Sequence, residues 1–517
     1  MRGDLTPALI DTDVWTDDML AGAGIPVVDV AFVSVGGGIG SFVTFDTLRI
    51  YGVPAAEIAV LGPQAIPWAS YEYLTRASQI PRGERIRSDS SSTPDNIWGF
   101  PSYAVREAFS AKSVSGFVKP LWNVLVEPIL ANYYTPRAGQ VFESLEREYH
   151  RIGYTDSVRI GDVRMIRRRS GGGYFTILTP SAESAPTKRV AFRSTHVHVA
   201  VGYPGLNMVP ELQEFRERYR DPSKVVNAYE PHEHVYQSLQ RRPGTVMIRG
   251  SGIVASRVLQ RLIDDRDRYG LQTTILHLFR TYVAGAHGPS IFKRRKGKHG
   301  WAYQGFNYPK SVWGGQLKSQ MRRLEGEARR RAYKEMGGTN TPVRKSWQEQ
   351  LRRGRTQGWY QVMAGTARDL RPAGNALDLT ATIVPDPTQP LPSPPPTQPF
   401  DVTVNYVIDC TGMEADIREH RLLADLLDHT GAGRNPLGRL DVDRTFELIG
   451  TRSGIGRIYA SGTATLGGYF PGVDTFLGLQ IAAQEIADDL AARGFCPRMG
   501  PLRSTHQWWL WARNERI

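Results

Sequence analysis

The sequence lacks the features that mark several common classes of protein. Its 517 residues include only two cysteines, Cys410 and Cys496, far apart in the chain. This excludes disulfide scaffolds, cysteine zinc sites and enzymes with a paired redox-active dithiol. No apolar run approaches the ~20 residues of a membrane-spanning helix, and the start MRGDLTPALIDTDVWTDD does not resemble a signal peptide. We therefore expect a cytoplasmic protein with no membrane partner.

Motifs of metal sites and of nucleophilic hydrolases are also missing. The sequence contains no H-E-x-x-H, no G-x-S-x-G and no clustered cysteines. His196 and His198 alternate along an apolar segment and would share one face of a strand, but no acidic or cysteine residues accompany them. We expect no metal, and we interpret one or both histidines as hydrogen-bonded residues of a strand.

Glycine and positive charge, in contrast, are plentiful. The chain has 52 glycines and a net charge of +13, and its most basic stretch is KRRKGKHG at 293–300, followed by MRRLEGEARRRAYKE at 321–335. The net charge suits an anionic cofactor or substrate, an acidic protein partner or nucleic acid, and it does not separate them. Because arginine and glutamate alternate at helical spacing in 321–335, a solvated helix face is favoured there over a binding patch.

Two distant segments, 27–63 and 244–282, share the order strand, glycine turn, helix, strand. In such a turn the first glycine makes the bend, and the second lets the backbone approach a pyrophosphate. A small third residue lets helix and strand pack closely, which leaves the diphosphate on free N–H groups at the helix start. The small residues are Gly36, Gly38, Gly40 and Ser41 in the first segment, and Gly250, Gly252 and Ala255 in the second. The sequence therefore predicts two dinucleotide-binding units.

Each unit continues in the same way. Two β-rich segments follow, and each set ends in a strand with a glycine turn, HVAVGYPG at 198–205 and VIDCTG at 407–412. The stretch 385–399, PDPTQPLPSPPPTQP, is too rich in proline for a helix or inner strand and predicts an exposed hairpin loop. Residues 456–494 then predict a strand, a glycine turn and a long amphipathic helix, whose start is a second candidate anion site.

This order of motifs resembles the two-dinucleotide-binding-domain flavoproteins over about residues 26–495. In that family FAD sits on the first unit and NAD(P)H on the second. AVGYP at 200–204 is similar to the family's A-T-G-x-x-x-x-P turn, and DCTG at 409–412 stands for the second A-T-G. YASGTA at 459–464 is similar to the flavin-ribityl motif, with Thr463 in place of aspartate. The resemblance implies cofactor contacts at Gly202, Gly412, Gly462 and Thr463.

The second strand of the first unit departs from the family. It ends in VLGP, with Gly62 and Pro63 where the family carries an acidic residue for the adenosine ribose. The second unit suits a phosphorylated ribose, because its corresponding strand ends in Arg280 and Thr281, and a guanidinium there pairs with a 2′-phosphate. Arg257 would contribute to the same site. We predict NADPH over NADH, the alternative being that Arg280 only caps a strand at the surface.

Within the family, residues 84–109 resemble the L-R-T-N-S and F-P-S segments of class B flavin monooxygenases. The matching residues are Arg87, Ser88, Asp89 and Ser90, then Phe100, Pro101 and Ser102. The tail at 470–490 is similar to the C-terminal helix of the N-hydroxylating members, and the F-x-G-x-x-x-H fingerprint of the Baeyer–Villiger subgroup is absent. The resemblance implies flavin contacts at Arg87 and Ser88.

We assign candidate catalytic residues to two polar segments. Asp89, Asn96 and Trp98 belong to RSDSSSTPDNIWGF, for which the alternative is a Ser-Thr-Pro-rich turn with Asp95 and Asn96 capping a short helix. In WAYQGFNYPKSVWGGQLKSQ, residues 301–320, the polar candidates are Asn307, Lys310 and Gln316. The alternative for this stretch is a rigid loop that buries aromatic rings between domains.

The sequence thus predicts an α/β protein of two Rossmann-like dinucleotide-binding domains, with the NADPH domain inserted in the FAD domain. We expect an N-terminal extension at 1–25, the FAD domain at 26–205 and 413–495, the NADPH domain at 206–412 and a tail at 496–517. The NADPH domain carries a basic and aromatic insertion at 291–360. The resemblance implies NADPH-dependent oxygenation of a small organic molecule through a C4a-(hydro)peroxyflavin.

Two alternatives to this function stay open. The first is an FAD-dependent NADPH reductase that passes electrons to a small acidic carrier such as ferredoxin, which the positive charge would suit. The second is a non-catalytic nucleotide-binding or nucleic-acid-binding protein that uses the basic segment 293–332.

Overall fold

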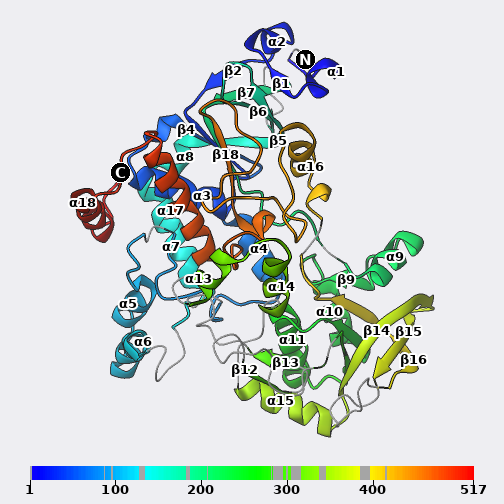
Figure 1. Ribbon diagram of the computed structural model, residues 1–517. Coiled ribbons are helices and arrows are strands. Elements are labelled where there is room, and N and C mark those ends of the chain that lie inside the picture. Colours follow the sequence, from blue (N-terminus) through cyan, green and yellow to red (C-terminus); the bar gives the residue numbers. More distant parts are fainter. Residues whose placement is uncertain are drawn as a thin grey trace.

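Two sheets organise the chain, and the second interrupts the first in sequence (Figure 1). The computed structural model describes residues 3–86, 88–94, 97–126, 134–181, 187–206, 208–280, 282, 295–298, 301–303, 316–336, 345–384, 396–413 and 416–517. The first sheet takes its strands from residues 14–199 and 457–460, and the second from residues 225–409. No described helix or strand crosses the predicted domain limits at 205, 412 and 495.

The first sheet has the order β18-β8-β3-β4-β5-β6-β7-β2, with β1 paired to β5. Its strands are β1 Val14–Trp15, β2 Val27–Asp29, β3 Phe32–Val35, β4 Ile58–Gly62, β5 Val158–Arg169, β6 Tyr174–Pro180, β7 Val190–Ser194, β8 His196–Val199 and β18 Arg457–Ala460. The strands from β18 to β5 run parallel, and β5, β6 and β7 form an antiparallel meander. All residues of β3, β4 and β8 are buried, as expected for parallel strands covered on both faces.

The second sheet has the order β16-β15-β14-β11-β10-β17-β9. Its strands are β9 Val225–Asn227, β10 Thr245–Arg249, β11 Thr274–Phe279, β14 Tyr360–Ala373, β15 Ala376–Val384, β16 Gln398–Val404 and β17 Tyr406–Asp409, and a separate pair is β12 Arg295–Lys298 with β13 Trp301–Tyr303. The strands from β9 to β14 run parallel. β15 and β16 pair antiparallel, which agrees with the predicted hairpin, although residues 385–395 of its loop lie outside the described residues.

Helices cover both sheets. They are α1 Pro7–Ile10, α2 Asp17–Gly22, α3 Ile39–Ile50, η1 Ala55–Glu57, α4 Ala69–Ala77, α5 Ser102–Phe109, α6 Val114–Val126, α7 Ala138–Arg151, α8 Tyr154–Ser157, α9 Pro210–Tyr219, α10 Glu233–Arg241, α11 Ile253–Tyr269, α13 Gln316–Arg323, α14 Gly326–Met336, α15 Lys345–Thr356, η2 Ile417–Glu419, α16 Arg421–His429, η3 Gly462–Thr465, α17 Phe476–Ala492 and α18 Pro501–Ala512. α3 packs against α17 in the first unit, whereas α11 and α9 bury apolar residues in two separate cores of the second. None of the helices in the described ranges is long and apolar enough to cross a membrane.

The strand before the first glycine turn is shorter than the sequence predicts. Residues 27–35 form two strands because the chain changes its pairing partner between them. The Val30 amide donates to the Arg193 carbonyl beside β7, whereas the next amide, of Ala31, donates to the Glu57 carbonyl before β4. Only Phe32–Val35 leads into the turn. β14, which no sequence signal predicted, contains Gly365, a bulge after Ala367 and Pro372. These features disrupt the alternation by which a strand is recognised.

Candidate cofactor sites

The first glycine turn connects β3 to α3, and its first glycine is required by packing. Gly36 has φ of +124° and Gly37 φ of +64°, which side chains rarely adopt. A Cβ on Gly36 would also overlap the carbonyl oxygen of Ala200, the residue after β8. Protein contacts therefore explain why Gly36 has no side chain.

Contacts within the protein do not explain why position 38 has no side chain. Its backbone is extended, with φ of −87° and ψ of −167°, a conformation that any residue adopts. The nearest atom to a Cβ built there is the Pro67 carbonyl oxygen, at 4.0 Å. Gly38 is the N-cap of α3, and no side chain among the described residues caps this helix, so its first amides have no capping partner there. An open glycine at an uncapped helix start is a cradle for an anionic group.

The second glycine turn, between β10 and α11, repeats this division. Gly250 has φ of +114°, and a Cβ there would lie 2.6 Å from the Cys410 carbonyl oxygen, just after β17. Gly252 has φ of −80°. Among the described residues, no atom lies within 4 Å of its built Cβ and no side chain caps α11. Both turns therefore have a first glycine that packing requires and a second one that it does not.

Buried polar groups hold the first turn in place. Ser41 accepts a hydrogen bond from the Gly37 amide at 3.2 Å and donates one to the Val35 carbonyl at 3.3 Å. His198 bridges Ser34 and Ser461, with Nδ1 3.0 Å and Nε2 2.9 Å from their hydroxyl oxygens. Burial lowers the pKa of His198 to about 3, so this ring is neutral. His198 is thus a hydrogen-bonded strand histidine, as interpreted from the sequence.

The second turn is supported by a different histidine. His277 of β11 donates from Nε2 to the Gly250 carbonyl at 2.6 Å, and its Nδ1 accepts from the Tyr360 hydroxyl at 3.1 Å. Burial lowers its pKa to about 4. Ala255, at the third small position, is fully buried beneath the turn. Within the described parts of the chain, no group of three His, Cys, Asp or Glu residues is placed to hold a metal.

The missing acidic residue at the end of β4 has a steric cause. A Cβ on Gly62 would lie 2.7 Å from the Gly36 carbonyl oxygen and 2.8 Å from the Gly37 Cα. The glycine turn therefore packs directly on this position, and no side chain fits there. Beyond it, Gln64 and Pro67 line the open side of the turn with their carbonyl oxygens. The Gln64 side chain accepts a hydrogen bond from the Ser70 hydroxyl at 3.0 Å.

Two further glycine motifs meet beside the first turn. The Thr463 hydroxyl donates to the Gly202 carbonyl at 2.6 Å, which joins the turn after β8 to η3. Gly202 and Gly462 both have positive φ, of +76° and +77°. A Cβ on Gly40 would lie 3.0 Å from the Ala200 Cβ and 3.6 Å from the Ser461 hydroxyl oxygen, so α3 packs closely here.

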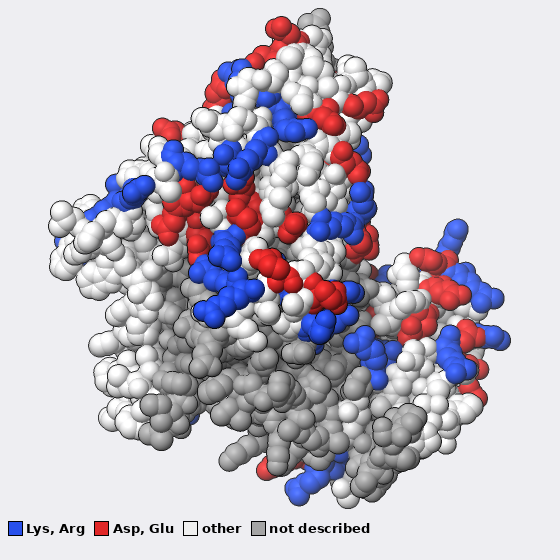
Figure 2. All heavy atoms as spheres, in the orientation of Figure 1, with Lys and Arg blue, Asp and Glu red and all other residues white. Residues whose placement is uncertain are grey.

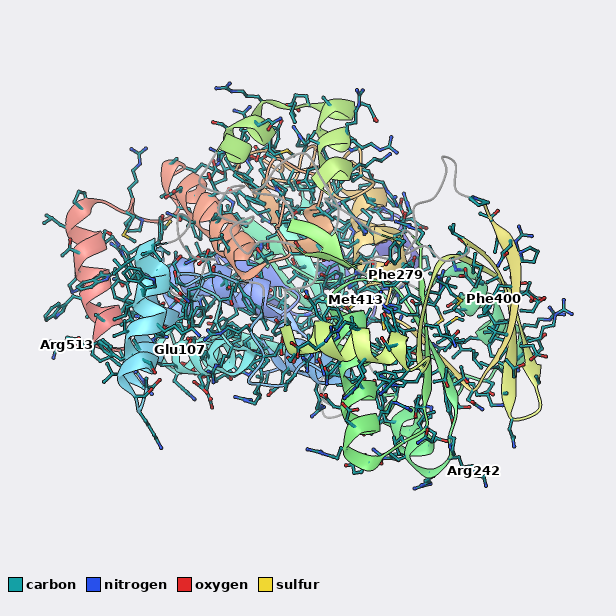
Figure 3. All side chains as sticks on the ribbon, turned by 90° about the horizontal axis from the view of Figure 1, so that it is seen from below. Glu107, Arg242, Phe279, Phe400, Met413 and Arg513 are labelled. Atoms are coloured by element: carbon teal, nitrogen blue, oxygen red, sulfur yellow. The ribbon has the colours of Figure 1, made fainter. Side chains whose placement is uncertain are left out.

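Gly412 belongs to the second unit. It has φ of +131° and lies two residues after Cys410, whose carbonyl oxygen packs on the second turn. Met413 next to it and Phe279 at the end of β11 lie at the same edge of the second sheet, toward the first unit (Figure 3). In parallel sheets, ligands bind at this carboxyl edge.

The serine-rich segment 88–94 lies against α17. The Thr93 carbonyl accepts a hydrogen bond from Gln480 of α17 at 3.3 Å. Ser88 and Ser92 are buried, yet neither hydroxyl has a hydrogen-bond partner among the described residues. Buried hydroxyls without partners are costly, so they fit a site that a ligand completes. Asp89 accepts bonds from the amide and hydroxyl of Ser91, both at 2.8 Å, and so closes a local turn.

Trp98 contacts the C-terminal helix. Its indole Nε1 donates to the Ser504 hydroxyl at 2.9 Å, and its ring lies 5.7 Å from that of Trp511. These contacts attach α18 to the first unit. The other predicted residues Arg87, Asn96, Thr281, Asn307 and Lys310 lie outside the described residues. The assignment of catalytic residues therefore stays a prediction.

The two arginines predicted for a 2′-phosphate differ in their surroundings. Arg257 of α11 forms an ion pair with Glu84 at 3.0 Å and donates to the Gln79 carbonyl at 3.1 Å, so its guanidinium joins the second unit to the first. Arg280, directly after β11, is exposed. Arg280 therefore remains the candidate, and Arg257 has an interdomain role.

The basic segment 316–336 forms a second connection between the units. Arg322 of α13 pairs with Glu485 of α17 at 2.8 Å and lies 4.6 Å from the Phe470 ring centroid. Arg329 of α14 is only 3% exposed and lies 3.8 Å from the ring centroid of Tyr469. The prediction of a solvated helix face is wrong for these arginines, because α13 and α14 pack on the first unit.

Three solved structures have a similar fold. No protein-family model and no curated protein sequence matches the chain. An ornithine N-hydroxylase of Kutzneria sp. 744, in a complex with reduced FAD, NADP+ and L-ornithine, matches with a TM-score of 0.62 and 14% identity over 90% of this chain and 100% of its own. The ornithine hydroxylase of Pseudomonas aeruginosa matches with a TM-score of 0.60 and 16% identity, over 90% and 100%. An FAD-bound cadaverine monooxygenase of Erwinia amylovora matches with a TM-score of 0.61 and 12% identity, over 92% and 98%.

At these identities the likeness concerns the fold. The chain has the two-domain fold of flavin-dependent N-hydroxylating monooxygenases, and the matches span each of those proteins nearly from end to end. This confirms the predicted α/β class with two units, one inserted in the other.

Proposed function

We propose that the protein is an FAD- and NADPH-dependent monooxygenase that oxygenates a small organic molecule. The observation that carries this proposal is the pair of open glycines, Gly38 and Gly252, each at the uncapped start of a long helix. Packing does not require either glycine, whereas a pyrophosphate lying on the backbone does. Two such cradles call for two dinucleotides.

The residues around each cradle fit the expected cofactor. For FAD, the first amides of α3 would hold the pyrophosphate, and the joined turns at Gly202 and Thr463 would lie beside it. The unpartnered hydroxyls of Ser88 and Ser92 would gain hydrogen-bond partners from a bound ligand. For NADPH, the start of α11 would hold the pyrophosphate, and Arg280 would pair with the 2′-phosphate.

FAD, once bound, supplies the chemistry of accepting hydride and activating oxygen. The chain itself has to bind the two cofactors, orient them toward each other and exclude water. Orientation falls to the two connections between the units, the Arg257–Glu84 pair and the helices α13 and α14. Hydride transfer needs the reacting atoms about 3–3.5 Å apart, so the angle between the units controls its rate. The buried segment 88–94 excludes water from its side of α17.

The substrate that we infer is a small primary amine. Three of the solved structures with this fold are enzymes of ornithine and of cadaverine, both of which carry a terminal amino group. They support the substrate class by analogy of fold. The test is to supply NADPH and oxygen to the purified protein with ornithine, cadaverine and a wider amine set, and to measure oxygen uptake and hydroxylamine product.

The same assay distinguishes a monooxygenase from the alternative of a carrier reductase. A carrier reductase would oxidise NADPH rapidly only with an acidic carrier such as ferredoxin, whereas a monooxygenase consumes oxygen without one. Cys410 and Cys496 are both buried, and burial raises both thiol pKa values, that of Cys496 to about 11, so neither suits a redox dithiol. Protein that binds neither FAD nor NADPH would overturn the proposed function.

A further inference from the structure

Helix α6 turns an apolar stripe toward solvent. Val114, Phe117, Val118, Trp122 and Leu125 are all exposed, and their spacing of three, one, four and three residues places them along one side of the helix. Trp122 is 54% exposed and Leu125 79%. An amphipathic helix normally turns such a stripe inward, and a cluster of exposed large apolar side chains marks an interaction surface.

The stripe continues onto the end of α5. Phe109, at the end of α5, stacks edge-on against Phe117 with ring centroids 5.4 Å apart. α18 contacts the other helix of this hairpin, α5, through Trp511, whose ring centroid lies 5.9 Å from Arg106. The apolar face, as we name it, consists of Phe109, Val114, Phe117, Val118, Trp122 and Leu125.

The charges around the apolar face are mostly positive. Lys112 and Lys119 are exposed on the α5–α6 hairpin. Within residues 100–126 the acidic residue is Glu107, and it is already paired with Arg85. Figure 2 shows the region of α5 and α6, at the lower left, as largely uncharged. Within residues 100–126 the face is therefore apolar with a cationic rim of two lysines.

We propose that the apolar face docks on an anionic lipid surface, with α6 lying in the plane of the interface. Helices that lie in a membrane interface combine large apolar side chains, tryptophan in particular, with lysine and arginine at their edge. Tryptophan suits this position because its apolar ring contacts the lipid chains while its N–H stays hydrated. The charge of the rim complements anionic headgroups.

A second copy of the chain fits the face less well. A two-fold interface brings the same patch of both copies together, so Lys112 and Lys119 of one copy would face the same lysines of the other. The sequence prediction of no membrane partner rested on the absence of a spanning run, and a helix that lies on the surface needs no such run. The docking does not depend on the proposed enzymatic function.

The test is co-sedimentation of the full-length purified protein with vesicles of phosphatidylglycerol and phosphatidylcholine, and with vesicles of phosphatidylcholine alone. The variant Trp122→Ser/Leu125→Ser removes the centre of the stripe. Ile455→Ser is the matched control, since Ile455 is also 79% exposed but lies in the turn before β18. Lys112→Gln/Lys119→Gln probes the rim without altering the helix stripe.

We expect binding to the anionic vesicles that weakens in 0.5 M salt, and much weaker binding to phosphatidylcholine, at about physiological pH. Trp122→Ser/Leu125→Ser should lower the vesicle affinity by more than about tenfold. Lys112→Gln/Lys119→Gln should lower it by about 25-fold, since each lysine near an anionic surface contributes about fivefold. Ile455→Ser should behave like the wild type. Absence of binding to anionic vesicles, or equal binding by all variants, would overturn the proposal. A dimer in sedimentation velocity that only the α6 variant dissociates, without vesicle binding, would assign the face to a second copy instead.

Discussion

Replacing Gly38 by alanine should separate cofactor binding from folding at the first glycine turn. The backbone of Gly38 is extended, and a built Cβ meets no protein atom closer than 4.0 Å, so the folded protein has room for the methyl group. A Gly-to-Ala change at a compatible backbone conformation and at a helix N-cap alters the free energy of unfolding by about 1 kcal/mol or less. We therefore expect Gly38→Ala to fold.

The cost should appear in FAD affinity. The methyl group would occupy the space through which a phosphate approaches the first amides of α3. Losing two hydrogen bonds to a charged group, at about 1.5–3 kcal/mol each, amounts to about 3–6 kcal/mol. This corresponds to a dissociation constant higher by about two to four orders of magnitude.

The assay compares the FAD content of purified proteins by absorbance, the affinity of the apoproteins for added FAD by fluorescence, and thermal unfolding without FAD. Gly22→Ala, at the open end of α2, is the neutral control. Gly36→Ala is the opposite control, because its Cβ would overlap the Ala200 carbonyl and it should fail to fold. A Gly38→Ala protein that retains FAD like the wild type would refute the argument from open glycines.

Three other changes test the second unit and the core. Gly252→Ala should weaken NADPH binding while FAD stays bound, measured as the rate of flavin reduction against NADPH concentration. Arg280→Ala should lower the NADPH preference over NADH by about 1.5–3 kcal/mol in kcat/KM, and equal use of both nucleotides by wild type would remove its basis. His198 has a folded pKa of about 3 against 6.5 normally, so it costs stability as pH falls from 6.5 toward 3, by about 1.4 kcal/mol per pH unit. Glutamine does not titrate, so His198→Gln should lower by one the number of protons taken up on unfolding below pH 6.5. The free energy of unfolding should then fall less steeply as the pH falls, and an unchanged slope would contradict this.

Much of the fold could be predicted because its signals are local. A buried strand, a glycine turn and a helix lie within about 25 residues of each other in both units, and the required small residues follow from backbone geometry alone. β14 was missed because Gly365, Pro372 and a bulge interrupt its pattern, while its pairing with β11 is a long-range contact. Its position depends on the sheet, and no short window of sequence records it.

The roles of individual charged residues were harder to predict for the same reason. Arg257 follows the second turn as a phosphate-binding arginine would, but its partner Glu84 is 173 residues away in the chain. The basic segment 316–336 has the alternating charges of a solvated helix, yet Arg322 and Arg329 lie on the rings of Phe470 and Tyr469. A short stretch of sequence shows that an arginine is charged, but it does not show which side chains the arginine contacts after folding.

The likeness of the two glycine turns supports the proposed pyrophosphate sites, because their supporting contacts differ. Ser41 ties the first turn by two hydrogen bonds, whereas Ala255 at the matching place makes none with its side chain. The supporting histidines differ as well, since His198 lies on the return strand β8 and His277 on the second strand β11. What the two turns share is a strained first glycine against the end of a neighbouring strand and an open second glycine at a helix start. Because the supporting contacts differ while the open position recurs, we infer that the common constraint is the proposed ligand, and a pyrophosphate would satisfy it in both turns.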